Sequence, residues 1–326
     1  MTRPGEVDLI ARYFAPIADP AGLGLKDDAA CLAPTPGHDL VVTVDALVEG
    51  VHFLQGDPPG SIARKALGVN VSDLAAKGAD PRGFVLALAL PDGWTADWLS
   101  AFADGLGRAA RDFGCPLLGG DTVRAAGPLT LSVTALGEVP RGRMVRRTTA
   151  RPGDAICVTG TIGDAALGLD LRGSPAWADD LSPEQRSVLA DRYLHPRPRH
   201  ALAAILREHA SAAMDVSDGL VGDLTRMLRV SGVSGSTNVD TVPLSDAARR
   251  AIQADRSLLE RALTGGDDYE ILCTVPVEQL DRFRERAGAV EIPVGVIGEV
   301  EAGDGPPIFR SDLGELRFES GSFSHF

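Results

Sequence analysis

The 326-residue chain lacks the cysteine patterns and long apolar runs that define several protein classes. No stretch approaches the ~20 apolar residues that a membrane-spanning helix needs. The first ten residues carry two acidic side chains and no apolar core of a signal peptide, so we expect a cytoplasmic protein. The four cysteines show no paired spacing, which disfavours a disulfide framework and predicts buried thiols. They are Cys31, Cys115, Cys157 and Cys273.

Basic residues are too few for a protein that binds phosphate backbones through its surface charge. Lysine and arginine number 32 against 45 aspartates and glutamates, which gives a formal net charge of -13. Such a surface repels nucleic acid and anionic lipid headgroups, so we expect neither as a partner. Part of the carboxylate excess can still serve anion binding, because bound divalent cations reverse the local charge.

Several catalytic signatures are also absent. The segment VTGTIGDAALGL spaces Gly163 and Gly168 as in a phosphate-binding loop, but Leu169 and Asp170 replace the lysine and the Ser/Thr. No dinucleotide-binding G-x-G-x-x-G lies between a strand and a helix. The six histidines form no HExxH and no Cys/His cluster, which disfavours zinc. A G-x-S-x-G nucleophile elbow is missing as well.

The order of apolar segments predicts a mixed α/β fold in two domains, 1–150 and 151–326. A basic stretch at 141–154 separates two α/β series, and the second contains a Pro/Ala-rich insertion at 173–184. The expected strands are Leu40–Val44, Gly83–Leu90, Leu129–Leu136, Ala155–Val158, a strand ending at Asp215, and Tyr269–Val275. The expected helices are Ser61–Gly78, Thr95–Phe113, Pro198–His209, Asp218–Val230 and Val277–Ala287, before a short β-rich tail.

Aspartates in apolar surroundings are the residues that suggest chemistry. In LVVTVDALVEG, Thr43 and Asp45 share one face of a strand and can reach one ion, although an Asp facing water at a sheet edge fits equally well. Asp73 falls on the apolar stripe of its helix. A buried carboxylate of this kind is paired with Arg or Lys, or binds a metal ion. Both interpretations of Asp73 are open, and the recurrence of such aspartates favours the metal.

Two further segments place aspartates where an apolar strand is expected to run into a turn. In CPLLGGDTV, two glycines allow a ligand close to the backbone and Asp121 follows them. In AAMDVSDGL, Asp215 and Ser217 project from one side of the strand, and Asp218 either binds a metal ion or caps the next helix. Asp27 and Asp28 add a further site of the same kind. Oxygen ligands without histidine or cysteine suit Mg²⁺, which bridges phosphates.

Seven segments together resemble the motifs of the thiamine-monophosphate kinase family. In chain order they are GLKDDAACL, TVDALVEGVHF, ALGVNVSDLAAKGADP, LLGGDTV, VTGTIGDAALGL, MDVSDGL and LTGGDDYEIL. Each motif alone is weak, but their ordered combination over nearly the whole chain is specific. The resemblance implies the two-domain fold of the aminoimidazole ribonucleotide synthetase-like superfamily, a homodimer formed by the N-terminal domain, and several Mg²⁺ ions. It also implies transfer of the ATP γ-phosphate to thiamine monophosphate, giving thiamine diphosphate and ADP.

The resemblance also implies roles for individual residues. The metal ligands would be Asp28, Thr43, Asp45, Asp73, Asp121, Asp215 and Asp218, with Val44 contributing only its backbone. The ATP contacts would be Gly120, Asp121, Arg147 and Ser217, and the thiamine contacts His52, Asp267 and Phe323. Three residues depart from the family pattern: Lys26 replaces a glycine, Val44 replaces a Ser/Thr, and Asp267 replaces a glutamate.

The acceptor in such a reaction is itself a phosphate and is already anionic at neutral pH, so no strong general base is required. Direct in-line transfer then needs alignment and charge neutralisation more than a nucleophile. Two alternatives remain open. One is another ATP-dependent synthetase of the superfamily, although MTRPGEVD and SFSHF lack the cysteines of two such enzymes. The other is a regulator that binds Mg-ATP without turnover.

Overall fold

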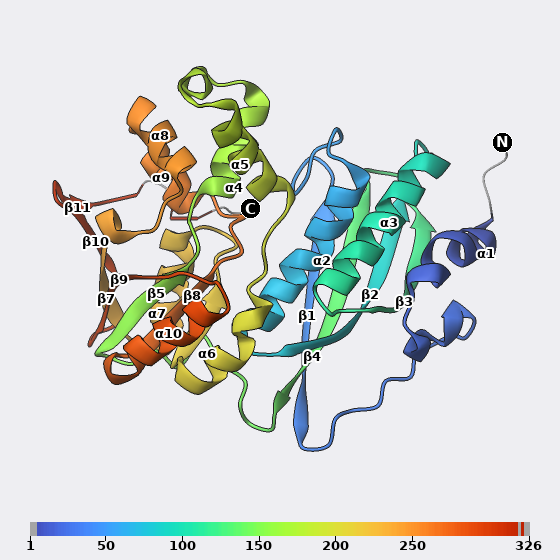
Figure 1. Cartoon of the computed structure of the whole chain (residues 1–326), viewed down its shortest axis with the longest axis horizontal. Helices are drawn as coiled ribbons and strands as arrows, with labels where there is room; N and C mark the ends of the chain where they lie inside the picture. The colour runs from blue at the N-terminus through green and yellow to red at the C-terminus, as the bar shows by residue number, and fades with distance from the viewer. Residues whose placement is uncertain (1–4, 319–320, 323–326) are drawn as a thin grey trace. The chain divides into compact units, whose positions relative to one another are not determined.

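The computed structural model describes residues 5–318 and 321–322, which form two compact units (Figure 1). The first unit comprises Met1–Leu74 and Ala79–Gly142, and the second comprises Ala75–Gly78 and Arg143–Phe326. Both units combine helices with a β-sheet, which confirms the predicted mixed α/β class. The sequence placed the domain boundary at residue 150, and the junction between the units lies at Gly142.

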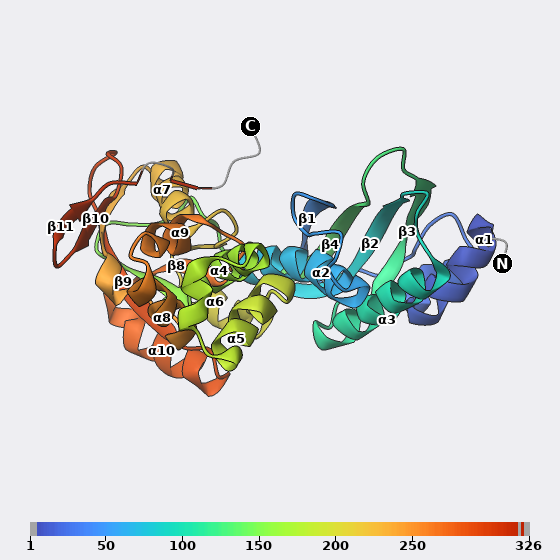
Figure 2. The same cartoon turned by 90° about the horizontal axis from the view of Figure 1, so that it is seen from above.

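The first unit is a four-stranded sheet with the strand order β1-β4-β2-β3. Helices α2 and α3 cover one of its faces (Figures 1 and 2). The N-terminal segment adds short helical turns between Glu6 and Leu25. The main elements are β1 (His38–Val48), α2 (Pro59–Ala76), β2 (Asp80–Leu90), α3 (Ala96–Asp112), β3 (Leu117–Arg124) and β4 (Thr130–Pro140), after α1 (Glu6–Leu9).

Side chains that alternate along the strands divide this sheet into a buried and an open face. On β2, Phe84, Leu86 and Leu88 are buried beneath the helices. On β1, every second residue lies on the other face, where Val42 and Val44 are 57% and 59% exposed. The first unit therefore presents an apolar sheet surface to solvent, and we refer to it as the open face.

The second unit is built around a seven-stranded sheet with the strand order β11-β10-β7-β9-β5-β8-β6. Its strands are β5 (Asp154–Thr159), β6 (Ala212–Asp215), β7 (Ser234–Asn238), β8 (Ile271–Pro276), β9 (Val294–Glu301), β10 (Ile308–Ser311) and β11 (Gly314–Leu316). Its helices are α4 (Asp164–Asp170), α5 (Pro183–Leu194), α6 (Ala203–His209), α7 (Leu220–Ser231), α8 (Asp246–Ala254), α9 (Leu258–Thr264) and α10 (Leu280–Ala289).

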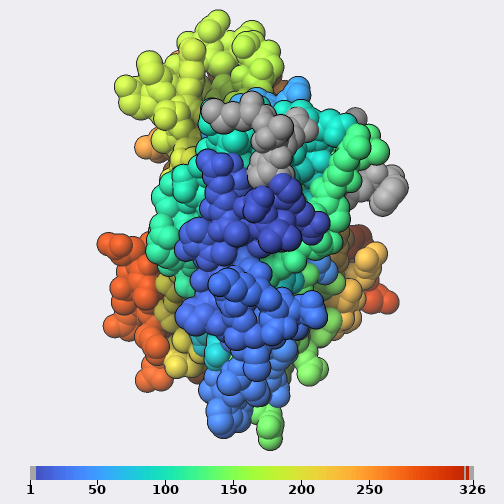
Figure 3. Space-filling model, turned by 90° about the vertical axis from the view of Figure 1, so that its right-hand side faces the viewer, coloured from blue at the N-terminus to red at the C-terminus, as the bar shows by residue number. Residues whose placement is uncertain are grey.

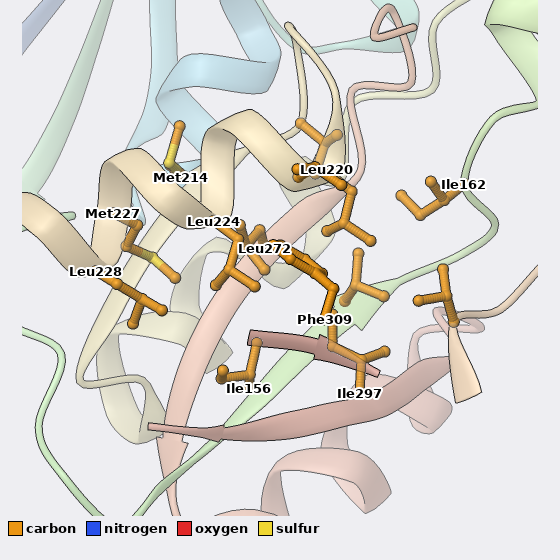
Figure 4. Packing of buried hydrophobic residues seen from close by; sticks show 14 of the residues in the cluster. Ile156, Ile162, Met214, Leu220, Leu224, Met227, Leu228, Leu272, Ile297 and Phe309 are labelled. Carbon is orange, nitrogen blue, oxygen red and sulfur yellow. The ribbon is translucent and has the colours of Figure 1, made fainter. Parts of the chain in front are cut away.

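Helices cover both faces of this second sheet, so its central strands are apolar on both sides. On β5, Ile156 belongs to the core beneath α7, whereas Cys157 belongs to the core beneath α6 and α10. Figure 4 shows the first of these cores, in which Leu224 and Met227 of α7 pack toward the sheet. This packing fixes the start of α7, directly after the segment that carries Ser217 and Asp218.

Most predicted elements are present with extended or shifted ends. The turn predicted after the apolar part of CPLLGGDTV is not present, because β3 continues through both glycines and pairs in parallel with β2 as far as Arg124. The prediction of four buried thiols was wrong for Cys31, which is exposed in an irregular segment.

Residues 173–184 contain a short 3-10 helix, Ala176–Asp180. Among the described residues, none of the helices combines the length and hydropathy needed to cross a bilayer.

Candidate functional site

The first group of predicted ligands lies between β1 and α2. Thr43 and Asp45 share the helix-covered face of β1, and the Thr43 hydroxyl donates a hydrogen bond to the Asp73 carboxylate of α2. In the described part of the chain, this carboxylate has no arginine or lysine partner. The interpretation of Asp73 as half of a buried ion pair is therefore wrong. The Asp73 carboxylate and the Thr43 hydroxyl lie next to each other, and both offer oxygen atoms to a metal ion.

Val44 cannot contribute its side chain to this group. It lies on the open face of the sheet, opposite to Thr43 and Asp45. Since β1 is an edge strand, only one side of its backbone is paired with β4. A backbone contact of Val44 with a ligand stays a prediction.

A second group lines a cavity of about 250 Å³ in the first unit. Asp27 and Asp28 form one part of its wall, and Gly119, Gly120 and Asp121 of β3 form another. The N-terminal segment, shown in blue at the surface in Figure 3, contributes apolar side chains. The sequence suggested that Asp28 follows a strand. This was wrong, because Asp28 lies in an irregular segment after residue 25. The fold nevertheless brings Asp28 and Asp121 to one cavity.

The two glycines before Asp121 have different structural reasons. A side chain at Gly120 would collide with the backbone of β2, because a Cβ there would lie 2.0 Å from the Leu86 carbonyl oxygen. At Gly119 a Cβ would meet nothing within 4 Å. The expectation that both glycines admit a ligand is thus supported only by Gly119, whereas strand packing requires Gly120.

In the second unit, residues 215–218 leave the end of β6 and approach α7. The backbone carbonyl of Ser217 accepts the N–H of Asp267 at 2.8 Å. The N–H groups of Ser217 and Asp218 donate to Asp223 at 3.1 and 3.0 Å. Asp218 is not the cap of α7, because Gly219 occupies the cap position and Asp218 instead accepts a hydrogen bond from Arg226 at 3.0 Å. The alternative in which Asp218 caps the helix is therefore wrong.

Asp223 was not predicted as a site residue, although its side chain is buried at the base of this turn. Burial raises the pKa of its carboxyl to about 7, and the N–H group of Asp218 and the charge of Arg226 act in the opposite direction. A signal was present in the sequence, because Asp223 falls on the apolar stripe of Leu220, Leu224 and Met227. The same reasoning singled out Asp73.

The motif GGDDYE forms a loop stabilised by buried carboxylates. Both Oδ atoms of Asp268 accept the Gly163 N–H at 2.9 Å, and burial holds the pKa of this carboxyl well above its usual range. Glu270 is fully buried and pairs with Arg192 and Arg199. Asp267 has a positive φ of 69°, a backbone conformation that aspartate tolerates better than glutamate. The replacement of the family glutamate at 267 thus has a local backbone rationale.

The remaining predicted residues are scattered along the chain. Nδ1 of His52 accepts the Val48 N–H at 3.0 Å, so the proton of the neutral imidazole is on Nε2. Arg147 is exposed in the second unit, and its carbonyl accepts a hydrogen bond from the Ser231 hydroxyl. Phe323 lies outside the described residues.

The donor set fits magnesium. Within residues 5–318 and 321–322, no three His, Cys, Asp or Glu side chains are arranged to hold a metal ion. Mg²⁺ is usually bound by one or two carboxylates, and waters and substrate phosphates supply the other ligands. Small oxygen groups such as Thr43 with Asp73, or Asp28 with Asp121, match this mode.

Comparison with known proteins shows which family the chain resembles. The family model of the AIR synthase related protein N-terminal domain matches residues 26–139, and that of the C-terminal domain matches residues 151–309. The thiamine-monophosphate kinase of Caulobacter vibrioides is 42% identical over 307 residues, which are 93% of this chain and 86% of that protein.

Two solved structures share this fold. The thiamine-monophosphate kinase of Stenotrophomonas maltophilia K279a has a TM-score of 0.79 at 41% identity, covering 90% of this chain and 91% of the other. AaThiL complexed with AMPPCP and TMP has a TM-score of 0.77 at 30% identity, covering 100% and 99%. The motif resemblance is confirmed, and the chain belongs to the thiamine-monophosphate kinase family.

Proposed function

We propose that the protein transfers the γ-phosphate of ATP to thiamine monophosphate, giving thiamine diphosphate and ADP, with several Mg²⁺ ions in the cytoplasm. The observation that carries the proposal is that this chain, which matches a thiamine-monophosphate kinase over 93% of its length, has a cavity whose wall bears Asp28, Gly120 and Asp121. The relative AaThiL was solved with AMPPCP, an ATP analogue, and TMP bound. The same two ligand classes are therefore the substrates that we assign here.

The first unit would hold the metal ions through Thr43, Asp45, Asp73, Asp28 and Asp121, with the Val44 backbone. When bound, Mg²⁺ offsets the repulsion between the two anionic substrates. The paired geometry of Thr43 and Asp73 supports this role, because the fold places their side-chain oxygens next to each other. Gly120 and Asp121 on the cavity wall would contact the nucleotide as well.

The second unit would add Asp215, Asp218, Ser217 and Arg147. Both backbone groups of Ser217 are already bonded within the protein, its N–H to Asp223 and its carbonyl to the Asp267 N–H. Its contribution to ATP binding would therefore come from its hydroxyl group. Arg147 is exposed and available to phosphate oxygens. His52, Asp267 and Phe323 would contact the thiamine monophosphate.

Direct transfer requires both substrates to be bound at once, with the acceptor oxygen in line with the γ-phosphorus. The O–P bond to the ADP leaving group breaks as the thiamine monophosphate oxygen attacks, and no bond to protein forms. The chain's own work is to align the two phosphates and to exclude water between them. The aspartates near the cavity are poor nucleophiles if they are engaged with cations.

The assay that tests the proposal uses γ-labelled ATP, Mg²⁺ and thiamine monophosphate. We expect ADP and labelled thiamine diphosphate, identified by mass, and intersecting initial-rate plots. Without the acceptor, neither ADP nor labelled protein should accumulate. Binding of Mg-ATP with no acceptor-dependent ADP would contradict a kinase and favour a regulator. Label that enters the protein and is then chased into thiamine diphosphate would exclude direct transfer.

We further propose that two copies form a homodimer through the first unit, with the active site shared between them. The donors on β1 and those on β3 lie at opposite edges of the four-stranded sheet. Three strand spacings separate these edges by about 14 Å. Within one chain the two groups are therefore held apart by two intervening strands, whereas a second copy with its β3 edge beside β1 would bring them next to each other.

The open face supports the same assembly, because Leu40, Val42 and Val44 would otherwise remain exposed. We expect Val42→Asp to shift the protein from dimer to monomer in light scattering, since a carboxylate would be buried in the interface. Val188→Asp is the matched control on an exposed position of α5 and should leave the mass unchanged. A monomeric wild type would contradict the proposal.

A further inference from the structure

Asp223 links the turn that carries Ser217 and Asp218 to the helix that follows it. Its Oδ2 accepts both turn N–H groups at 3.1 and 3.0 Å, and its Oδ1 accepts Nη1 of Arg226 at 3.3 Å. The carboxylate is fully buried, so these donors replace the water that it lacks. Asp223 therefore holds the backbone of the turn and Arg226 at the same time.

Arg226 has a second partner in the same turn. Its Nη1 donates to Oδ2 of Asp218 at 3.0 Å, so one nitrogen bridges a buried and a partly exposed carboxylate. The side chains of Asp218 and Arg226 are 30% and 35% exposed, which leaves their contact open to ions from solvent. The contact with Asp223 differs, because Asp223 is inaccessible to solvent.

We propose that Arg226, anchored by Asp223, is a built-in counter-charge for Asp218 that a divalent cation must displace in order to bind this carboxylate. The inference rests on the proposed function, in which Asp218 is assigned to a metal ion. A guanidinium at this position occupies a lone pair of Asp218 and repels an incoming cation. Without metal, it offsets the repulsion between Asp218 and Asp223 and keeps the turn in place.

Displacement would leave Arg226 on Asp223. Removing the partner of a buried carboxylate is strongly unfavourable, so Arg226 remains with Asp223 while its contact with Asp218 is exchanged. Arg226 and Asp223 are thus positioning residues: they act on the metal through Asp218 and on ATP through Ser217, and they touch neither. They would set the metal concentration at which the site fills.

The test measures binding of Mn²⁺ alone, from the loss of the free-ion electron paramagnetic resonance signal. Arg226→Gln should lower the half-saturating Mn²⁺ concentration about fivefold, the factor that corresponds to an exposed charge pair. Arg229→Gln removes the same charge from an exposed position on the same helix and should have less than half this effect on a logarithmic scale. Asp218→Asn should abolish the gain in the Arg226→Gln background.

Asp223→Asn separates this idea from a purely structural role. The asparagine keeps an acceptor for the N–H groups of the turn but removes the charge that holds Arg226, which is then left with Asp218 as its only charged partner. Since Arg226 then competes more strongly for Asp218, we expect weaker Mn²⁺ binding. This is the opposite of the effect of Arg226→Gln. The double variant should bind like Arg226→Gln, since the released competitor is gone. Unchanged, weaker or undetectable binding by Arg226→Gln overturns the proposal, and so does additivity in the double variant. The readout contains neither ATP nor thiamine monophosphate, so a failure of kinase activity is recognised separately.

Discussion

Asp121→Asn is expected to lower kcat at least ~100-fold, because it removes one charged oxygen ligand from the proposed nucleotide site. The folded state should hardly change, since the side chain is exposed on an edge strand and surface substitutions cost within about 0.5 kcal/mol. Steady-state kinetics together with thermal unfolding check both parts. Asp104→Asn, on the exposed side of α3, is the matched control and should retain full activity.

Mixing two inactive variants tests whether the site is shared between two copies. Asp45→Asn, on β1, should be as inactive as Asp121→Asn, on β3. If the β1 donors of one copy work with the β3 donors of the other, a mixed dimer contains one intact site. Random re-association should then restore about a quarter of the wild-type activity. No recovery after verified subunit exchange would mean that each chain forms its site alone.

His52→Ala provides the contrasting substrate-side variant. The imidazole is assigned to thiamine monophosphate, so its loss should raise the apparent KM for this substrate far more than that for ATP. Equal effects on both substrates would indicate that His52 acts on the fold, through the hydrogen bond that its Nδ1 accepts from Val48.

Glu270→Ala should lower the free energy of unfolding by about 3 to 5 kcal/mol, since it leaves buried arginine charge without its partner. Arg192 donates to Oε1 of Glu270 at 2.8 Å, and Arg199 donates to Oε2 through Nε at 2.6 Å. The Thr159 hydroxyl donates to Oε2 at 2.7 Å. Glu270 is fully buried and Arg192 is 5% exposed, so water cannot replace these contacts.

The measurement is the free energy of unfolding of the second unit, obtained from chemical denaturation. Glu285→Ala, on the exposed side of α10, removes the same group from a solvated position and should change stability by less than about 0.5 kcal/mol. Glu270→Gln should fall between the two, because it keeps the shape but loses the charge. A Glu270→Ala protein as stable as the control would show that Arg192 and Arg199 find other partners and that their contacts with Glu270 do not stabilise the fold.

The size of this effect is relevant to the candidate site, because Glu270 and Asp267 belong to one loop. Asp267 lies three residues before Glu270, and its N–H bonds the carbonyl of Ser217. A side chain at Gly266 would collide with this carbonyl at 2.3 Å. The loop therefore packs its backbone directly on the turn that carries Ser217 and Asp218.

Local patterns were sufficient to predict the α/β elements and the carboxylates that stand in apolar surroundings. The alternation on β1 placed Thr43 and Asp45 on one face, and the 3.6-residue period of α2 placed Asp73 among buried residues. The ordered motifs identified the family. These features are readable because they depend on neighbours within a few residues of one another.

The sequence by itself determined the chemistry: oxygen ligands, no nucleophile of the common signatures, and an acidic chain that needs cations to bind phosphate. The tertiary structure decided which residues meet. Asp28 shares a cavity with Asp121, Glu270 meets Arg192 and Arg199, and the β1 and β3 donors are separated by the strand order. Contacts between residues far apart in the chain depend on how strands pair and helices pack, and no local period encodes them.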